Sequence, residues 1–250
     1  MPSSPRPVRP PQDRFHFHMA IACAVVAFAG FAPTYWVPLA AGTFAGRPVM
    51  HIHGLIFSAW TLFFVYQTWL VARERSVRHR AVGLAGISLA TGMVILGVLA
   101  SISQMKGAEA QGLLPAGKAF AIVPLAGLLF FAVLVTIAIA KVREPEVHKR
   151  LMLVASISIL DAAVARWFLT FLAPPGPPGP PPVFVATPPA LAAYVLLVVA
   201  MVHDWRKTGR VHPVYYWCGG VLVAIKFVQI PLSETAVWHG IAGWVLSLAR

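Results

Sequence analysis

Long apolar runs dominate this sequence and leave few folds open to it. Seven runs alternate with short polar connections, and each is close to the roughly 20 residues that an α-helix needs to cross a bilayer. Backbone groups in lipid must pair within the protein, and the residue alternation of a membrane β-barrel is absent. We therefore predict an all-α integral membrane protein, a seven-transmembrane-helix bundle with spans at roughly 19–38, 51–72, 81–104, 119–140, 151–172, 185–203 and 214–232.

Composition agrees with this class. The chain is 58% hydrophobic and only 11% charged, whereas soluble domains carry about 25% charged residues. Its mean hydropathy is +0.75. The 250 residues suffice for one helical bundle and leave no room for a second, soluble domain.

The formal net charge of +12 is unevenly placed along the chain. Most Lys and Arg residues lie in the N-terminal tail and in segments 73–80, 141–150 and 204–210, on alternate connections. The positive-inside rule then predicts a cytoplasmic N-terminus and, after seven crossings, a C-terminus outside. We interpret the charge as an orientation signal in a lipid bilayer and expect no nucleic-acid binding.

Four shorter features complete the expected layout. Residues 1–18 are predicted to be a flexible, basic, Pro-rich tail, and residues 173–182 a stiff polyproline connector. Residues 233–250, with Ser233 as N-cap, are expected to form a helix at the outer interface, although a lid over a cavity is the alternative. Cys23 and Cys218 are expected to be buried free thiols.

A short motif occurs three times: basic residues, a histidine and then an apolar run. It reads SVRHRAVGLAG around His79, PEVHKRLMLVA around His148 and GRVHPVYYWCG around His212. We interpret it as a weak repeat of a membrane hairpin, with each histidine at the cytoplasmic start of a span. His203, which ends span six, should lie at a similar depth.

Histidines at one depth could ligate a haem or bind a quinone. Their surroundings are positive because helix amino ends and basic side chains lie there, which opposes a bare metal ion and favours an anionic group such as a haem propionate. Arg80, Lys149 and Arg150 are candidates to neutralise such groups. On the opposite side, His53 could face inward together with Trp60. For all these histidines, contact with lipid headgroups is the alternative.

Asp161 lies about ten residues into span five, near mid-membrane. An ionisable residue at that depth is costly unless it faces protein or water, so it is a functional candidate. Arg166 follows on a different face of the helix, and Lys226 and Gln67 are possible polar partners of Asp161. A buried ion pair that fixes helix packing is the alternative. A Schiff-base role for Lys226 is not supported by its neighbours, and we interpret Lys226 as extending toward the interface.

The strings HxHGLxFxxWxxxxxxQ (51–67), RHRxVG (78–83), HKRLM (148–152) and GRVHP (209–213) together resemble an uncharacterised family of bacterial seven-span inner-membrane proteins. The resemblance covers most of the chain and implies a bacterial inner-membrane location, but no activity. HKRLM alone is also similar to a string in small membrane proteins that assist cytochrome oxidase assembly, which makes His148 a candidate functional position.

Three functional hypotheses follow from these observations. The first is a haem b- or quinone-associated protein of respiratory electron transfer or oxidase biogenesis, in which Asp161 handles a proton. The second is a small-molecule transporter or lipid-binding protein that uses Asp161 and Arg166. The third is a structural subunit of a respiratory or other membrane complex. No soluble-enzyme motif is present, and the sequence leaves open whether the protein is an enzyme.

Overall fold

A computed structural model describes residues 14–173 and 179–249. These residues form helices and connections, with no strand among them. The expected flexible tail lies outside the described residues up to residue 13, and the first helix already begins at Phe15. Part of the Pro-rich connector, residues 174–178, also lies outside them.

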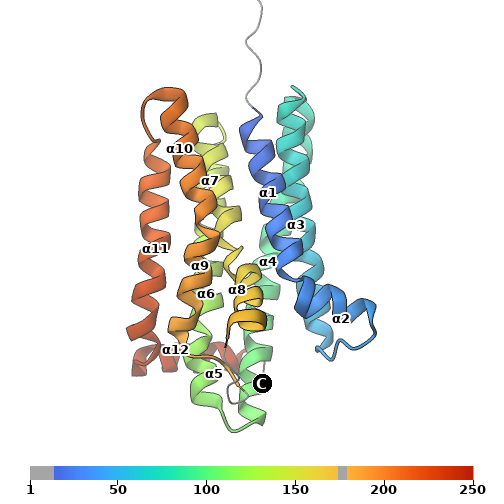
Figure 1. Ribbon diagram of the computed structural model, residues 1–250, viewed down its shortest axis with the longest axis vertical. Coiled ribbons are helices and arrows are strands. Elements are labelled where there is room, and N and C mark those ends of the chain that lie inside the picture. Colours follow the sequence, from blue (N-terminus) through green and yellow to red (C-terminus); the bar gives the residue numbers. More distant parts are fainter. Residues whose placement is uncertain (1–13, 174–178, 250) are drawn as a thin grey trace, which may run out of the picture.

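The helices run up and down in chain order (Figure 1). Their bounds are α1 (Phe15–Gly30), the π-helix η1 (Ala32–Trp36), α2 (Val37–Ala40), α3 (Pro48–Ala72), α4 (Ser76–Ala110), α5 (Leu114–Phe120), α6 (Ile122–Ala140), α7 (Pro145–Ser158), α8 (Asp161–Trp167), the π-helix η2 (Phe168–Leu172), the 3-10 helix η3 (Val183–Ala186), α9 (Thr187–Ala193), α10 (Val195–Thr208), α11 (Pro213–Ser233) and α12 (Ala236–Ser247).

Six of the described helical segments are long and apolar enough to cross a membrane, and a seventh is a bent pair. In that pair α1 meets η1 and α2 at an angle of 41°. Pro33 explains the bend, because it has no N–H to donate to the preceding turn. The structure thus confirms an all-helical protein with membrane-spanning helices, six in number or seven if the bent pair crosses.

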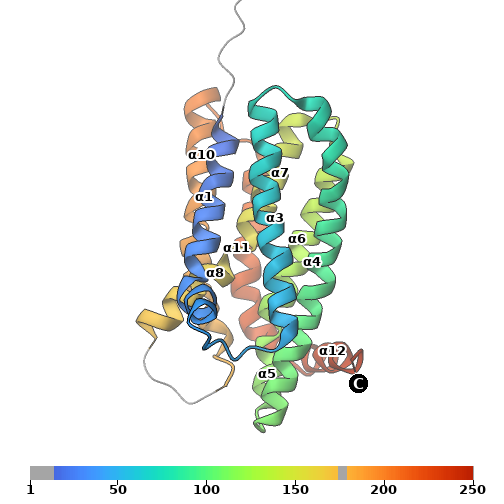
Figure 2. The ribbon, with the colours of Figure 1, turned by 90° about the vertical axis from the view of Figure 1, so that its right-hand side faces the viewer.

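The two ends of the bundle differ in charge. We call one the basic end: it holds the start of α1 and the connections 73–75, 141–144 and 209–212, with many of the Lys and Arg residues in or beside them. We call the other the α12 end, because α12 lies across it (Figure 2). The N-cap of α12 is Thr235, whose hydroxyl accepts from the Trp238 amide (3.2 Å), and not Ser233 as expected.

Several spans are interrupted by a break in the helix. The span Leu114–Ala140 breaks between α5 and α6, where Pro124 cannot donate to the carbonyl of Phe120. The span Pro145–Leu172 breaks between α7 and α8, where a side-chain oxygen of Asp161 accepts from the Ala162 amide (2.7 Å). A carboxylate that binds its own backbone competes with the helical hydrogen-bond pattern. Asp161 therefore sits at a break rather than within a continuous helix.

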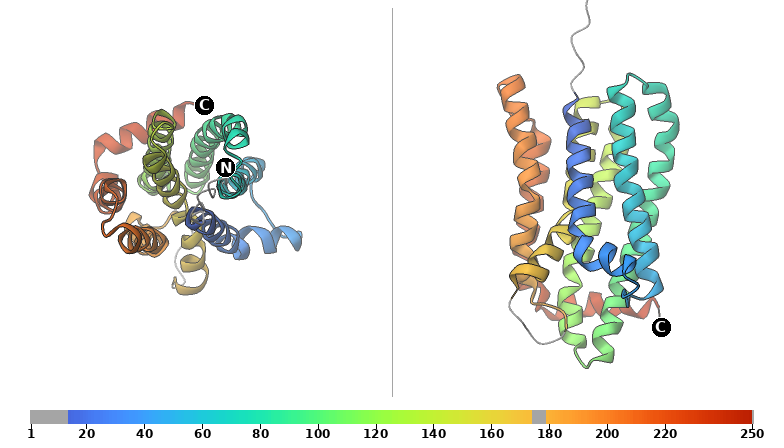
Figure 3. Two further views of the ribbon diagram at one scale, coloured as in Figure 1. Left: turned by 90° about the horizontal axis from the view of Figure 1, so that it is seen from above. Right: turned by 45° about the vertical axis from the view of Figure 1, so that its right-hand side comes forward.

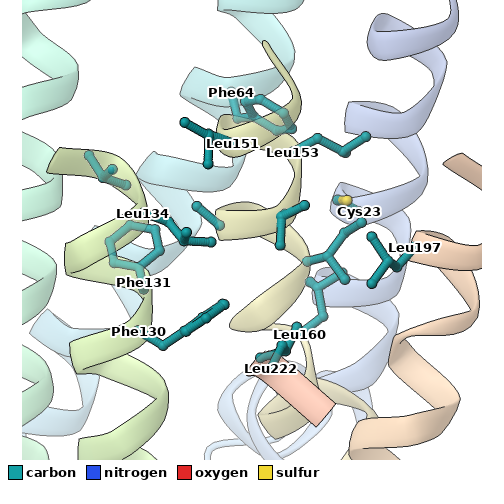
Figure 4. Close-up of a cluster of buried hydrophobic side chains, with 14 of the residues drawn as sticks. Cys23, Phe64, Phe130, Phe131, Leu134, Leu151, Leu153, Leu160, Leu197 and Leu222 are labelled. Atoms are coloured by element: carbon teal, nitrogen blue, oxygen red, sulfur yellow. The ribbon is translucent and has the colours of Figure 1, made fainter. Parts of the chain in front are cut away.

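α7 is the central helix of the bundle. Every residue from Arg150 to Ser158 except Met152 is buried. Leu151 and Leu153 pack between Phe131 and Leu134 of α6 on one side and Cys23 of α1 on the other (Figure 4). Small residues toward the end of α7 allow the neighbouring helices to approach closely. Cys23 is a buried free thiol, as expected, and Cys218 is free and partly buried.

Candidate functional site

Two of the histidines expected to share a site lie side by side at the basic end. His79 lies in the first turn of α4 and His148 in the first turn of α7, with ring centroids 6.4 Å apart and ring planes nearly perpendicular (82°). Nδ1 of His148 donates to the carbonyl oxygen of Ala138 (2.8 Å). In the neutral ring, this bond fixes the tautomer and leaves Nε2 of His148 as an acceptor.

Gln67 is the third member of this group. With its nitrogen turned toward α4, its carboxamide donates to Nδ1 (2.5 Å) and to the carbonyl oxygen (3.2 Å) of His79, and its oxygen accepts from the Gly83 amide (3.3 Å). Gln67 is therefore a partner of His79. The sequence had suggested Asp161 as the partner of Gln67, and that prediction was wrong. Its position orients the His79 ring and ties α3 to the start of α4.

The other two histidines of the basic end lie apart from this pair. The His203 ring stacks on Phe15 of α1, with centroids 3.7 Å apart. His212 caps α11, where its Nδ1 accepts from the Val214 amide (3.2 Å). Partial burial, with the nearby Arg150 guanidinium, lowers the pKa of His212. Within residues 14–173 and 179–249, no three His, Cys, Asp or Glu side chains gather closely enough to hold a metal ion.

The basic side chains expected to neutralise a cofactor have different surroundings. Arg150 forms a two-pronged ion pair with Asp204 of α10 (2.8 Å for each bond) and also donates to the Glu146 carboxylate (2.6 Å). Arg150 is 6% exposed and Asp204 is 2% exposed, so this pair joins α7 to α10 in the interior. Lys149 pairs with Glu146 at the surface (2.7 Å), and Arg80 is exposed.

Asp161 pairs with Lys226 of α11, with Nζ 2.6 Å from Oδ2. The Lys226 side chain is fully buried (0% exposed) and that of Asp161 is 17% exposed. The interpretation of Lys226 as extending to the interface was wrong, because its helix face points into the bundle. The alternative, a buried ion pair between spans five and seven, describes this contact. Such a pair links α8 to α11 and leaves Arg166 without Asp161 as a partner.

Arg166 instead borders a cavity of about 300 Å³ between α1–α2, α3 and α8. Its guanidinium lies over the ring of Phe31, 5.7 Å from the centroid. Within the described part of the chain it has no hydrogen-bond acceptor and no carboxylate partner. The close packing of α1 beside α8 is visible along the bundle axis (Figure 3), and Trp167 fixes it by donating to the carbonyl of Ala29 (2.8 Å).

The cavity walls are rich in aromatic rings, contributed by Phe28, Phe31, Tyr35, Trp36, Phe44 and Phe57. Two of its polar groups are donors that have no acceptor in the described residues, the Arg166 guanidinium and the buried Trp36 indole N–H; the hydroxyls of Thr34 and Ser58 also line it. The hydroxyl of Tyr35 is bonded to Nδ1 of His51 (3.0 Å). Donors without acceptors suit a ligand with electronegative oxygens and an apolar body.

His53 lies beside this cavity and not in its wall. Its ring packs on Phe57, with centroids 4.2 Å apart, and its Nδ1 is buried without a hydrogen bond within residues 14–173 and 179–249. His53 and Trp60 are on the inward side of α3, as expected, and Trp60 is 2% exposed against Phe131.

Sequence reasoning found Asp161, Arg166, His79 and His148 and named Lys226 as a possible partner of Asp161, but it missed the contact of Gln67 with His79 and that of Asp204 with Arg150. Asp204 could have been noticed as an acidic residue beside His203 within an apolar span. The aromatic cavity has no such signal, because it forms only where segment 27–46, α3 and segment 159–166 come together. Comparison of the chain with protein-family models, curated proteins and solved structures finds no match.

Proposed function

We propose that this protein binds an amphipathic anion, such as an organic carboxylate, in the cavity beside Arg166. The observation that carries the proposal is a guanidinium that borders an aromatic-walled cavity and has no anionic partner in the described residues. A charge in a span is costly unless it is compensated. A bound carboxylate would compensate it with two parallel hydrogen bonds.

The cavity walls support an apolar body for this ligand. Six aromatic rings border a volume of about 300 Å³, at the lower end of the size of small-molecule sites. A ligand that enters here comes from the bilayer or from the nearby interface at the α12 end. The proposed function is thus the binding of a lipid-phase small molecule, which belongs to the second hypothesis from the sequence. Of the two residues named in that hypothesis, Arg166 is the one that would bind the ligand, because Asp161 is already neutralised by Lys226.

The test compares a carboxylate with its neutral analogue. Purified full-length protein in mild detergent is mixed with oleate, 2-naphthoate or oleyl alcohol, and native mass spectrometry counts the bound molecules. We expect at least one carboxylate to be retained in preference to the alcohol. Arg166→Gln should weaken that binding by about tenfold or more, as expected for losing a charge-assisted hydrogen bond.

Arg47→Gln is the matched control. Arg47 lies at the same end of the bundle, is exposed, and donates to Ser103 rather than lining the cavity. Carboxylate binding should survive this change. Equal retention of carboxylates by the wild type and by Arg166→Gln would disprove the proposal.

The histidine pair favours a second candidate function. Nδ1 of His148 donates to the carbonyl oxygen of Ala138, the arrangement typical of a histidine whose Nε2 ligates a metal or haem, and the His79 ring lies beside it. A redox cofactor such as haem b or a quinone at the basic end would place the protein in respiratory electron transfer or oxidase biogenesis. The test is a reduced-minus-oxidised spectrum of protein expressed with ample haem. A Soret and α-band lost in His148→Ala but kept in His203→Ala would support haem, and a colourless protein would remove it.

We also propose the orientation that the charge distribution predicts. The bent pair α1–α2 crosses as a seventh span, the basic end faces the cytoplasm, and α12 lies on the outer surface of a bacterial inner membrane. Support comes from the basic residues at one end of the bundle.

A further inference from the structure

The inward face of α11 changes character at mid-membrane. Lys226, Gln229 and Ser233 are spaced by three and four residues, so they lie on one side of the helix. All three are buried. On the same face toward the basic end the buried residues are Leu222, Gly219 and, in the first turn of α11, Tyr215. The buried face of α11 is therefore polar from Lys226 to the α12 end, and it is apolar from Leu222 to Gly219, directly before Lys226.

Gln229 is the unusual member of this polar face. It is 2% exposed, yet neither its amide nitrogen nor its amide oxygen has a hydrogen-bond partner among the described residues. A buried carboxamide left dry and unpaired would cost several kcal/mol. Buried polar groups without protein partners are ordinarily paired with water. The Gln229 side chain thus indicates that this part of the interior is hydrated.

The helices that face α11 add further polar groups. Thr187, the first residue of α9, donates to the carbonyl oxygen of Lys226 (3.2 Å). The hydroxyl of Tyr194, between α9 and α10, is buried without a partner in residues 14–173 and 179–249. The ammonium of Lys226 has three N–H groups and only one bond to Asp161. Several donors and acceptors around one ion pair remain available to water.

The polar face reaches the surface at the α12 end. The hydroxyl of Ser233 bonds to the carbonyl oxygen of Ile230 (2.7 Å) and lies 3.4 Å from the carboxylate of Glu234, which is exposed. Toward the basic end, Leu222 is 1% exposed and Gly219 lies in tight contact with Leu197, so the interior is closed there.

We propose that Ser233, Gln229 and Lys226 line a hydrated half-path that brings water, and with it protons, from the α12 end to Asp161. The path ends at the Asp161–Lys226 pair, because Leu222 and the close contact of α11 with α10 block it beyond. It is independent of ligand binding at Arg166, which lies on another face of α8. Through this path the buried ion pair can exchange water and protons with the solution on one side of the membrane only.

Cysteine accessibility tests this path, because only a thiolate in contact with water reacts rapidly with a water-soluble thiosulfonate. Single cysteines are placed at Gln229 and Ser233 of the full-length protein, in which Cys23 and Cys218 are changed to Ala. The variants are reconstituted in nanodiscs, which expose both faces, and treated with 2-sulfonatoethyl methanethiosulfonate. We expect both cysteines to react about tenfold or more faster than the controls.

Two controls on the same helix bracket the path. Val228→Cys is exposed on the lipid side, and Leu222→Cys lies on the buried face beyond Lys226, so both should react slowly. A Gln229→Cys variant that elutes as folded protein and reacts no faster than Leu222→Cys would overturn the proposal. If Gln229→Cys does not fold, Ser233→Cys is the deciding variant. Fast reaction of Ser233→Cys together with slow reaction of Leu222→Cys supports the path, and slow reaction of Ser233→Cys overturns it.

Discussion

Arg150 and Arg166, the two arginines of span five, are in opposite situations, and their substitution should show it. Arg150 is bound on both sides by carboxylates, whereas among the described residues Arg166 has an aromatic ring and a cavity beside it and no carboxylate. Arg150→Gln leaves Asp204 buried without its counterion, which typically costs about 3–5 kcal/mol. Arg166→Gln removes a charge that has no partner, so the ligand-free protein should change by less than about 1 kcal/mol or become more stable.

Thermal unfolding of the two variants in the same detergent, without added ligand, checks this contrast. Arg47→Gln serves as an exposed reference at the α12 end. A large loss of stability in Arg166→Gln would mean that the guanidinium has a structural partner and would count against a ligand role.

The Asp161–Lys226 pair should behave as one unit. Lys226→Met leaves a carboxylate with no counterion, and Asp161→Asn leaves a fully buried ammonium, so each change alone should cost about 3–5 kcal/mol. The double variant removes both charges and should be more stable than the two separate losses predict, with a coupling of about 1–3 kcal/mol. A double-mutant cycle of unfolding free energies measures this coupling. Additive losses would show that the two side chains do not depend on each other.

At this scale the sequence revealed which residues were unusual and offered Lys226 as one of two possible partners of Asp161, but it did not decide which contacts form. Asp161 stood out because of its depth in an apolar run, and that signal is local. The role of Lys226 depends on the rotation of α11 about its axis. The spacing of Lys226, Gln229 and Ser233 predicts one polar face, but it does not show that this face meets Asp161. The bond between Gln67 and His79 depends on the pairing of α3 with α4, which composition does not encode.

At the scale of elements, the contact between α1 and α8 is the tightest constraint on the cavity. A Cβ added to Gly30 would lie 2.5 Å from the carbonyl oxygen and 2.6 Å from the Cβ of Ala163. Backbone atoms cannot yield as a flexible side chain can, so Gly30→Ala should separate the helices at a cost of about 1–3 kcal/mol. Carboxylate binding should weaken as well, because Phe31 and Arg166 lie next to this contact.

Gly127→Ala is the matched control in α6, since a Cβ there meets nothing within 4 Å. It should leave stability unchanged or slightly raised, as Ala is the better helix former. Unfolding midpoints of the two variants provide the comparison, and equal midpoints would contradict close α1–α8 packing.

Helix lengths were accessible from the sequence, whereas helix breaks were only partly so. Pro33 is a visible cause of a bend in the first span, and the bend of 41° lies just before it. The break before Asp161 was not expected, because Ile159 and Leu160 are ordinary helix residues and the competing bond to the Ala162 amide is a detail of side-chain geometry. The aromatic cavity exists because the bent first span and the broken fifth span lie side by side. Neither segment alone predicts a cavity from its sequence.

At the scale of the whole molecule, the first span decides the topology. If the bent pair α1–α2 crosses, the chain has seven spans and its termini lie on opposite sides; if it does not, six spans remain. The start of α1 lies at the basic end and α12 lies across the other end (Figure 2), and basic connections are retained in the cytoplasm. We therefore expect a cytoplasmic N-terminus and an external C-terminus.

Fusions to green fluorescent protein and to alkaline phosphatase measure this topology, because the first fluoresces only inside the cell and the second is active only outside. An N-terminal fluorescent fusion should be bright, a C-terminal one dark and a C-terminal phosphatase active, with a fusion truncated at residue 209 as the cytoplasmic reference. Bright fluorescence from both termini would mean that α1–α2 enters and leaves the membrane on one side. The segment α1–α2 would then be re-entrant, and the ligand would reach the cavity beside Arg166 through it.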